Sequence, residues 1–273
     1  MIDALIFDSG VGGLSVSAAV RQRLPHLALG YVCDNAALPY GTRTGTKGGT
    51  QGEAWLSERI VAVCARACHL AQPRALVVAC NTASTLALEA LRQRLPIPVI
   101  GTVPAIKPAA EFSRRRSIGL LATAATVRRP YLDRLIETFA ADCSVVRVAA
   151  DSLVGEAERL LRGVAVDPSR LREAIEPLLA EPGPDVVVLG CTHFPLLREW
   201  LEPLIPGALW LDSGDAIARR LAVVLAEDAT VPQGERDVGA SPSWASAASA
   251  EGLALALGGF GYSPPRDLDL PLR

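Results

Sequence analysis

The alternation of short strand-like runs with longer helical patterns is the feature that most limits how this 273-residue chain can fold. Apolar, β-rich runs are followed by stretches in which apolar residues recur every three to four positions. Parallel strands need long crossovers, usually helices, so this alternation predicts a parallel α/β fold. The strand-like runs are residues 4–7, 29–33, 75–79, 118–121, 145–148 and 186–189, and the helical stretches are 14–24, 54–71, 85–95, 127–139, 171–179, 215–225 and 249–257.

Two short motifs occur twice and suggest two related halves. Residues 77–82 read VVACNT and residues 187–192 read VVLGCT, while an apolar run ends in DSG at 8–10 and again at 212–214. The chain is also longer than a typical single domain. Because parallel sheets bind ligands at the carboxyl ends of their strands, we expect the two cysteine motifs to meet in one cleft between two lobes.

Composition excludes several classes of function. The formal net charge of −2 and the pI near 6.0 give no basic field for nucleic acid or an anionic membrane. The sequence shows no signal-peptide pattern and no uninterrupted apolar run of membrane-spanning length, so we expect a soluble cytoplasmic protein. The six cysteines form no dense framework, which favours free thiols over disulfides.

Cys80 and Cys191 are the strongest candidates for chemistry. Each follows a predicted strand, and the helix expected after Cys80 would offer free N–H groups to a thiolate or a substrate carboxylate. A single such cysteine is more often buried and inert, but the second copy, with His193 two residues further on, calls for a shared explanation. Racemisation needs an acid/base group on each face of a stereocentre, and a thiol pKa of about 8.5 needs only a modest depression for that task.

Two further segments offer polar groups beside predicted strands. The segment FDSGVGG, with Asp8, contains glycines that would let backbone amides approach an anion, but Ser15 occupies a position where the dinucleotide fingerprint needs glycine. Asp8 is either a helix N-cap or a carboxylate that binds an ammonium group and assists a cysteine. The segment DNAALPYG presents Tyr40 and Gly41, which offer a ring, a hydroxyl and backbone donors.

Other motifs have simpler interpretations. Residues 45–52, GTKGGTQG, are typical of a flexible loop, and a surface insertion is favoured over an active-site flap. Cys64, Cys68 and His69 lie in a predicted helix without a second ligand pair at zinc spacing, so core packing is favoured over a metal site. We therefore expect no metal.

The motifs FDSGVGGLSV, PYG, ACNTAS, GTVPAIKPA and GCTHFPL occur in the order seen in glutamate racemases, and the chain resembles that family over roughly residues 5–220. The resemblance implies two pseudo-symmetric α/β lobes with mainly parallel sheets flanked by helices, and an active site in the cleft between them. It also implies conversion of L-glutamate to D-glutamate for peptidoglycan without PLP or any other cofactor. We expect residues 1–99 together with 209–273 to form the first lobe and residues 100–208 the second.

The resemblance also assigns roles to residues. It implies that Cys80 and Cys191 are the paired proton donors and acceptors, assisted by Asp8 and His193. The residues that it places around the substrate are Asp8, Ser9, Tyr40, Gly41, Asn81, Thr82, Thr123, Thr192 and His193. A further family carboxylate corresponds to Glu158 in the segment SLVGEAE, where Glu156 competes for the same role. The segment before PYG lacks the arginine and cysteine found in many members.

Several alternatives stay open at this point. The family includes enzymes activated by a peptidoglycan precursor, and the chain is expected to be a monomer or a homodimer. Rival functions are racemisation of another amino acid such as aspartate, a non-catalytic glutamate sensor, and a dithiol redox protein, although Cys80 and Cys191 lack C-x-x-C spacing. The family suggests that Cys191 deprotonates L-glutamate and Cys80 deprotonates D-glutamate.

Overall fold

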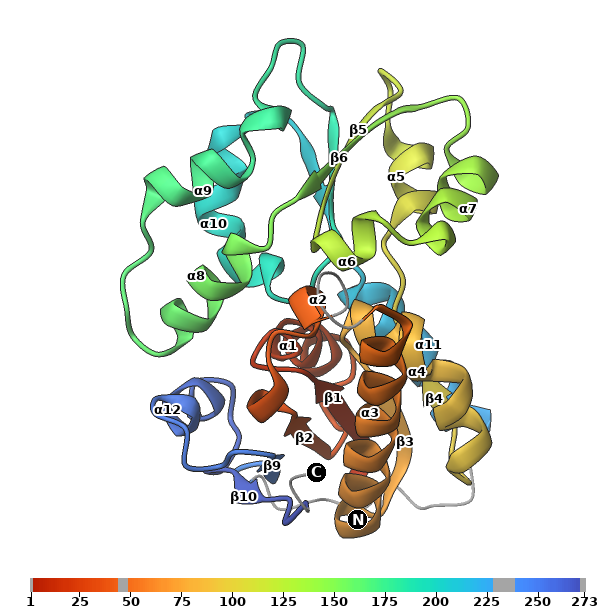
Figure 1. Cartoon of the computed structure of the whole chain (residues 1–273), viewed down its shortest axis with the longest axis vertical. Coiled ribbons are helices and arrows are strands. Elements are labelled where there is room, and N and C mark those ends of the chain that lie inside the picture. Colours follow the sequence, from red (N-terminus) through yellow and green to blue (C-terminus); the bar gives the residue numbers. More distant parts are fainter. Residues whose placement is uncertain (1, 44–48, 228–238, 271–273) are drawn as a thin grey trace.

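The protein contains two parallel β-sheets, one above the other in Figure 1. The computed structural model describes residues 2–43, 49–227 and 239–270. The larger sheet has the strand order β10-β9-β2-β1-β3-β4 and the smaller sheet the order β6-β5-β7-β8. The strands are β1 (Ile2–Asp8), β2 (Leu29–Cys33), β3 (Pro73–Val78), β4 (Val99–Ile100), β5 (Ser117–Ala122), β6 (Ser144–Ala149), β7 (Val186–Leu189), β8 (Leu209–Leu211), β9 (Ser243–Ala245) and β10 (Arg266–Asp267). The predicted α/β fold with two lobes is confirmed.

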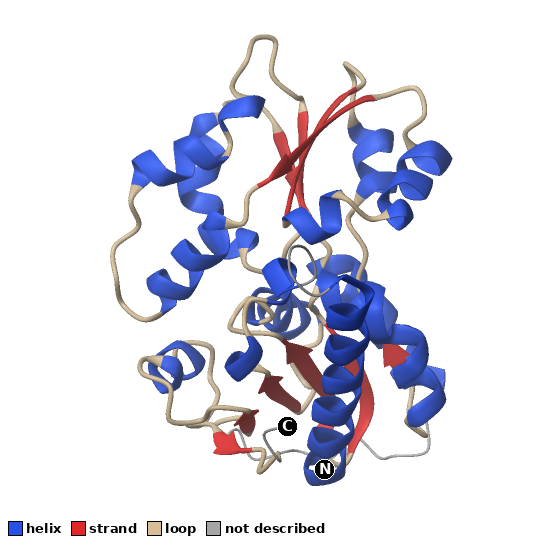
Figure 2. Ribbon diagram, in the orientation of Figure 1, coloured by secondary structure: helices blue, strands red, loops and turns tan. Residues whose placement is uncertain are grey.

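Helices cover both faces of each sheet (Figure 2). The α-helices are α1 (Leu14–Arg23), α2 (Tyr40–Arg43), α3 (Gly49–Ala71), α4 (Asn81–Arg94), α5 (Ile106–Phe112), α6 (Ala124–Val127), α7 (Pro130–Phe139), α8 (Ser152–Leu161), α9 (Pro168–Ala174), α10 (Arg198–Leu201), α11 (Gly214–Glu227) and α12 (Leu253–Gly258). Helices α3 and α4 pack on one face of the larger sheet, and α1, α11 and α12 pack on the other. Helices α8, α9 and α10 cover one face of the smaller sheet, and α5 and α7 cover the other.

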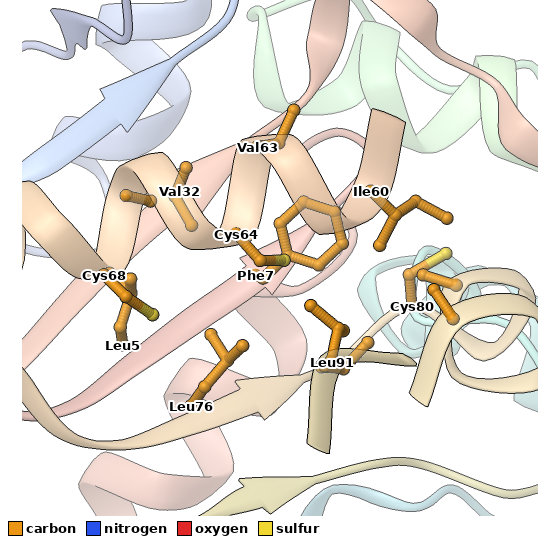
Figure 3. Close-up of a cluster of buried hydrophobic side chains, with 14 of the residues drawn as sticks. Leu5, Phe7, Val32, Ile60, Val63, Cys64, Cys68, Leu76, Cys80 and Leu91 are labelled. Carbon is orange, nitrogen blue, oxygen red and sulfur yellow. The ribbon is translucent and has the colours of Figure 1, made fainter. Parts of the chain in front are cut away.

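The core beneath α3 explains two of the six cysteines. Figure 3 shows Cys64 and Cys68 among the apolar side chains of α3, β1, β2 and β3, and both cysteines are buried. His69 faces solvent instead. Burial raises the pKa of the Cys68 thiol to about 12, as expected for an inert core thiol. The two cysteines point into the same core and His69 points away from it, so core packing accounts for the cysteines, and His69 does not join them.

Strand order reveals which sequence repeat reflects the pseudo-symmetry. The order β2-β1-β3-β4 in the larger sheet matches β6-β5-β7-β8 in the smaller one, so β3 and β7 are equivalent strands. Cys80 and Cys191 follow these two strands. The DSG repeat, however, follows β1 and β8, which are not equivalent. At both copies the Asp Oδ1 accepts the N–H of the residue two positions on, Gly10 at 3.0 Å and Gly214 at 2.8 Å, so this repeat is a local turn.

The chain passes between the sheets twice. Residues 101–105 lead into the smaller sheet, residues 212–213 lead back, and Ser213 Oγ donates to the Val103 carbonyl at 2.6 Å between these two crossings. Strand β8 pairs with β7, which places residues 209–211 in the smaller sheet rather than with the first lobe. The division into 1–99 with 209–273 and 100–208 otherwise stays a prediction.

Two predictions made for local structure, the helix at 127–139 and the loop at 45–52, differ from the structure. The stretch 127–139 is interrupted at Arg128 and Arg129, because the helical conformation is disfavoured before Pro130. Residues 49–52 of the predicted loop instead begin α3, whose packing overrides the poor helix propensity of glycine, and residues 45–48 lie outside the described residues. Among the described helices, none is both long and apolar enough to cross a membrane.

Candidate active site

Cys80 and Cys191 line the same cavity between the two sheets, which holds about 340 Å³ of empty space. Short helices α2 and α6, which contact each other, lie beside it in the middle of Figure 1. The lining residues are Ser9, Leu38, Pro39, Tyr40, Gly41, Cys80, Asn81, Thr82, Thr123, Thr126, Val154, Gly190, Cys191, Thr192 and His193. The structure therefore brings together eight predicted substrate residues and both cysteines, although they come from distant parts of the chain.

Cys80 stands immediately before α4, at the carboxyl end of β3. Its Sγ lies 3.9 Å from Ser9 Oγ. Burial raises the pKa of the Cys80 thiol and the charge of Asp8 raises it further, while the Ala83 N–H acts in the opposite direction. The helix terminus thus acts on the thiol as expected, but its effect is smaller than that of burial. The expected depression of this pKa is absent, and Cys80 is held as a neutral thiol, ready to donate a proton.

Cys191 has a different partner. Its Sγ lies 3.8 Å from His193 Nδ1, and the other ring nitrogen, Nε2, lies 2.9 Å from Glu158 Oε1. Burial alone would lower the pKa of His193, but the hydrogen bonds and charges of Cys191 and Glu158 raise it well above its usual value. Burial opposes ionisation of Glu158 as well, yet its bond to His193 and the Val11 N–H lower its pKa. An imidazolium paired with a carboxylate therefore stands next to Cys191.

Asp8 is fully buried at the end of β1, between the two cysteine environments. Its Oδ1 accepts the Gly10 N–H at 3.0 Å, and its Oδ2 accepts the Thr192 hydroxyl at 2.9 Å. Burial raises the pKa of Asp8, against the opposing charge of His193 and these two hydrogen bonds. Asp8 caps no helix by its side chain, because Gly13 is the N-cap of α1. Its contacts instead cross from the larger sheet to the Cys191 segment.

The geometry of α8 shows which of the two candidate carboxylates, Glu158 or Glu156, reaches the site. Both side chains are buried in α8, two residues apart. Glu158 reaches His193 and also accepts the Val11 N–H at 2.9 Å from the other side of the cavity. Glu156 points to the opposite side, where its Oε1 binds Arg170 at 2.9 Å. Glu158 is therefore the carboxylate that reaches the site.

The glycines of the FDSGVGG motif serve close packing across the cleft. A Cβ on Gly12 would collide with His193 Nδ1 and would lie 2.5 Å from Thr192 Oγ1. A Cβ on Gly10 would likewise meet Glu158 Oε1. The sequence predicts that these glycines let backbone amides approach an anion. One amide of the motif does so: the Val11 N–H donates to the Glu158 carboxylate of the protein itself.

Substitution of Gly12 by alanine should separate the two sides of the cavity. Overpacking at a tight contact costs about 1–3 kcal/mol, so we expect a lower melting temperature and a large loss of activity as His193 is displaced. Gly155→Ala is the matched control: this exposed glycine lies in α8, and an added Cβ meets nothing within 4 Å. Equal melting temperatures and activities for the two variants would contradict this account of Gly12.

Tyr40 contributes differently from the prediction. Its hydroxyl donates to Asp34 Oδ2 at 2.6 Å and is thereby directed away from the cavity, so Tyr40 offers its ring and main chain only. The sequence also failed to identify Thr126, whose hydroxyl lies 3.3 Å from that of Thr123. Its position three residues after Thr123 at the start of a helix was the available signal.

Asn81 has an unsatisfied acceptor in the cavity wall. Its Oδ1 is buried and has no hydrogen-bond partner among the described residues. Among the described lining residues none is Arg or Lys, so a bound carboxylate would be held by hydroxyls and N–H groups. No group of three or more His, Cys, Asp or Glu side chains within the described ranges is arranged to hold a metal ion.

Comparison with known proteins finds a matching family model and several similar relatives. A family model described as Asp/Glu/Hydantoin racemase matches residues 14–221. The glutamate racemase of Sodalis glossinidius is 44% identical over 263 residues, which cover 94% of this chain and 88% of that relative. The glutamate racemase of Pectobacterium atrosepticum is 48% identical over 225 residues, covering 81% and 76% respectively.

Solved structures of glutamate racemases share the fold. The Escherichia coli enzyme, crystallised with L-glutamate and the activator UDP-MurNAc-Ala, has a TM-score of 0.88 and 40% identity over 98% of both chains. The RacE1 isoform of Bacillus anthracis has a TM-score of 0.78 and 26% identity over 100% of this chain and 99% of that one. The resemblance predicted from the five motifs is thereby confirmed. This chain belongs to the Asp/Glu/hydantoin racemase family and is an amino-acid racemase, an isomerase.

Proposed function

We propose that this racemase interconverts L-glutamate and D-glutamate by a two-base mechanism in which Cys80 and Cys191 act on opposite faces of the α-carbon. The observation that carries the proposal is that both thiols line one small cavity, each with its own polar partners. Inversion requires removal of the α-hydrogen from one face and delivery of a proton to the other. Two acid/base side chains in one cavity supply both steps without a cofactor.

The different settings of the two thiols suggest the direction of the first step. Cys80 is held as a neutral thiol by burial and by Asp8. In the cycle that begins with Cys80 as proton donor, Cys191 must be the acceptor. His193 stands 3.8 Å from Cys191 and has a raised pKa, so it can hold a proton near that sulfur and exchange it. Following the family, we assign L-glutamate deprotonation to Cys191 and D-glutamate deprotonation to Cys80.

Neutral hydrogen-bond donors and one hydrogen-bond acceptor that has no partner within the described part of the chain would bind the substrate. The Asn81 Oδ1, which lacks a partner among the described residues, suits the substrate ammonium group, assisted by Asp8. Hydroxyls of Ser9 and Thr82, with N–H groups at the start of α4, suit the carboxylates, while the Thr192 hydroxyl already donates to Asp8. Excluding water from this cavity when the substrate is bound would strengthen such contacts as negative charge develops at the α-carbon.

The biological role is proposed from the relatives. The Escherichia coli neighbour was crystallised with an activator, UDP-MurNAc-Ala, as well as L-glutamate. We propose that this chain supplies D-glutamate for peptidoglycan in the cytoplasm and responds to a precursor of that kind.

The direct test is circular dichroism of L-glutamate with the purified protein, after dialysis against a chelator and without added PLP. We expect the signal to decay to zero as the racemate forms, and the reverse approach from D-glutamate to reach the same end point. L-aspartate in parallel tests the neighbouring substrate class. Glutamate binding measured by calorimetry without any loss of the signal would support a non-catalytic sensor, and racemisation only after addition of PLP would contradict the cofactor-independent mechanism.

A further inference from the structure

An ion pair with a fully buried carboxylate stands behind one wall of the cavity. Arg59 of α3 donates from Nε to Asp34 Oδ2 and from Nη2 to Asp34 Oδ1, both at 2.6 Å. The Asp34 side chain is 0% exposed and that of Arg59 is 13% exposed. The hydrogen bond to Asp34 raises the pKa of Arg59, which keeps the guanidinium charged. A bidentate guanidinium–carboxylate pair of this kind fixes orientation as well as distance.

The same carboxylate holds the cavity wall. Tyr40 donates its hydroxyl to Asp34 Oδ2 at 2.6 Å, and the wall on this side is formed by Leu38, Pro39, Tyr40 and Gly41. A Cβ added to Gly41 would lie 2.9 Å from Thr123 Cβ, so the wall already touches the opposite side of the cavity. A small shift of Tyr40 would therefore change both the width of the cavity and its closure against Thr123.

Asp34 also connects this wall to the base of the site. Its backbone N–H donates to the Asp8 carbonyl at 3.0 Å, while its side chain is bound to Arg59 and Tyr40. One residue thus links the end of β1, where Asp8 lies, to the main chain of Tyr40 and Gly41. Arg59 completes the support from α3, where the Trp55 ring lies 5.7 Å from its guanidinium.

From these contacts we infer that Asp34 and Arg59 are positioning residues that hold the Leu38–Gly41 wall against the bound amino acid and thereby set substrate affinity. This inference rests on the proposed function, because it assigns the wall to glutamate. Neither side chain lines the cavity, so neither touches the reacting atoms. Loss of binding that is equal in the ground state and the transition state raises KM and leaves kcat nearly unchanged.

Three substitutions remove different parts of the hydrogen-bond network formed by Arg59, Asp34 and Tyr40. Tyr40→Phe removes one hydrogen bond and keeps the ring and the ion pair. Arg59→Lys keeps the charge but loses the bidentate geometry, and Arg59→Ala removes the pair. The matched control is Arg66→Ala, on the same helix, where Arg66 Nε donates to the Leu268 carbonyl at 3.0 Å away from the cavity.

Steady-state racemisation should show KM rising about threefold to tenfold in Tyr40→Phe and at least about tenfold in Arg59→Ala, with Arg59→Lys between wild type and Arg59→Ala. We expect kcat to stay within about threefold for each, and both constants to be unchanged in Arg66→Ala. The split between KM and kcat distinguishes positioning from general destabilisation, which lowers the active fraction and leaves KM unchanged.

An unchanged KM in Tyr40→Phe overturns the inference, even if Arg59→Ala does not fold. A fall in kcat with constant KM would also overturn it, because the substitution would then act on the chemistry or on the folded fraction rather than on binding. If the wild-type protein exchanges no α-hydrogen of either glutamate enantiomer in D₂O, the proposed function fails instead. If the wild-type protein does exchange the α-hydrogen but KM is unaltered in the variants, only the positioning role of Asp34 and Arg59 is contradicted.

Discussion

Replacement of either Cys80 or Cys191 by serine is expected to lower the racemisation rate by about 10²–10⁴-fold, the usual contribution of a general acid or base. A serine hydroxyl has a far higher pKa than a thiol, so it is a poor base at the position where a proton must be removed. Because each turnover needs one base and one acid, the loss of one thiol slows racemisation in both directions. The measurement is the change in circular dichroism of L-glutamate and of D-glutamate with each variant.

Isotope exchange tests the arrangement of the two bases. With thiols on opposite faces, product formed early in D₂O carries deuterium, while the remaining substrate stays unlabelled. A single base serving both faces would return the original hydrogen to part of the product. Mass spectrometry of the separated enantiomers at low conversion reads this difference.

The control is another cysteine that lies outside the cavity. Cys143 is partly exposed just before β6, and Cys143→Ser should retain full activity. Melting temperature and glutamate affinity show whether the Cys80 and Cys191 variants remain folded. Wild-type rates in either of those two variants would refute the two-base assignment.

The sheet and the cysteine positions were accessible from the sequence because they depend on local patterns. The runs at 29–33 and 186–189 coincide with β2 and β7, since buried parallel strands are continuous apolar segments. The repeated segments VVACNT and VVLGCT correctly indicated two equivalent strands, because each places a cysteine two residues after the end of an apolar strand. The β8 strand was missed because three residues, Leu209–Leu211, carry no periodicity that can be separated from their surroundings.

The contacts of the site were less accessible because they join residues far apart in the chain. The composition of FDSGVGG suggested an anion site, but only the fold shows that Glu158 is the anion that meets Val11. The Tyr40 hydroxyl appeared available for substrate until Asp34 and Arg59 were placed behind it. Burial, which raises the pKa of Cys80, depends on the whole core and has no local sequence signature.

Replacement of Glu158 by glutamine is the second change with a large expected effect. His193 would lose the carboxylate that binds its Nε2 at 2.9 Å, while burial, which lowers its pKa, would remain. The pKa of His193 should therefore fall, although the hydrogen bond and charge of Cys191 would still act to raise it. We expect a large decrease in kcat near neutral pH. The part of the pH–rate profile that reflects titration of His193 (its pH limb) should shift toward lower pH. The measurement is the pH dependence of kcat and kcat/KM.

The same substitution should change stability in a defined pH window. The raised pKa of His193 gives a contribution that is complete below the ordinary histidine value of about 6.5 and is lost as pH rises through the raised value. The lowered pKa of Glu158 gives a contribution that is complete above about 4.3 and is lost as pH falls through the lowered value. The pair therefore stabilises most between about pH 4.3 and 6.5. There, Glu158→Gln should cost about 2 kcal/mol, with the difference from wild type shrinking outside the window.

Glu156→Gln separates this effect from the general cost of changing a buried carboxylate. Glu156 lies in the same helix and is equally enclosed, but its Oε1 binds Arg170 rather than a histidine. Its replacement should lower the melting temperature and leave the pH limb of kcat in place. If Glu156→Gln moved that limb as far as Glu158→Gln, or if neither moved it, His193 would not owe its charge to Glu158. A shift confined to Glu158→Gln would show that the Glu158 carboxylate, together with Cys191, raises the pKa of His193.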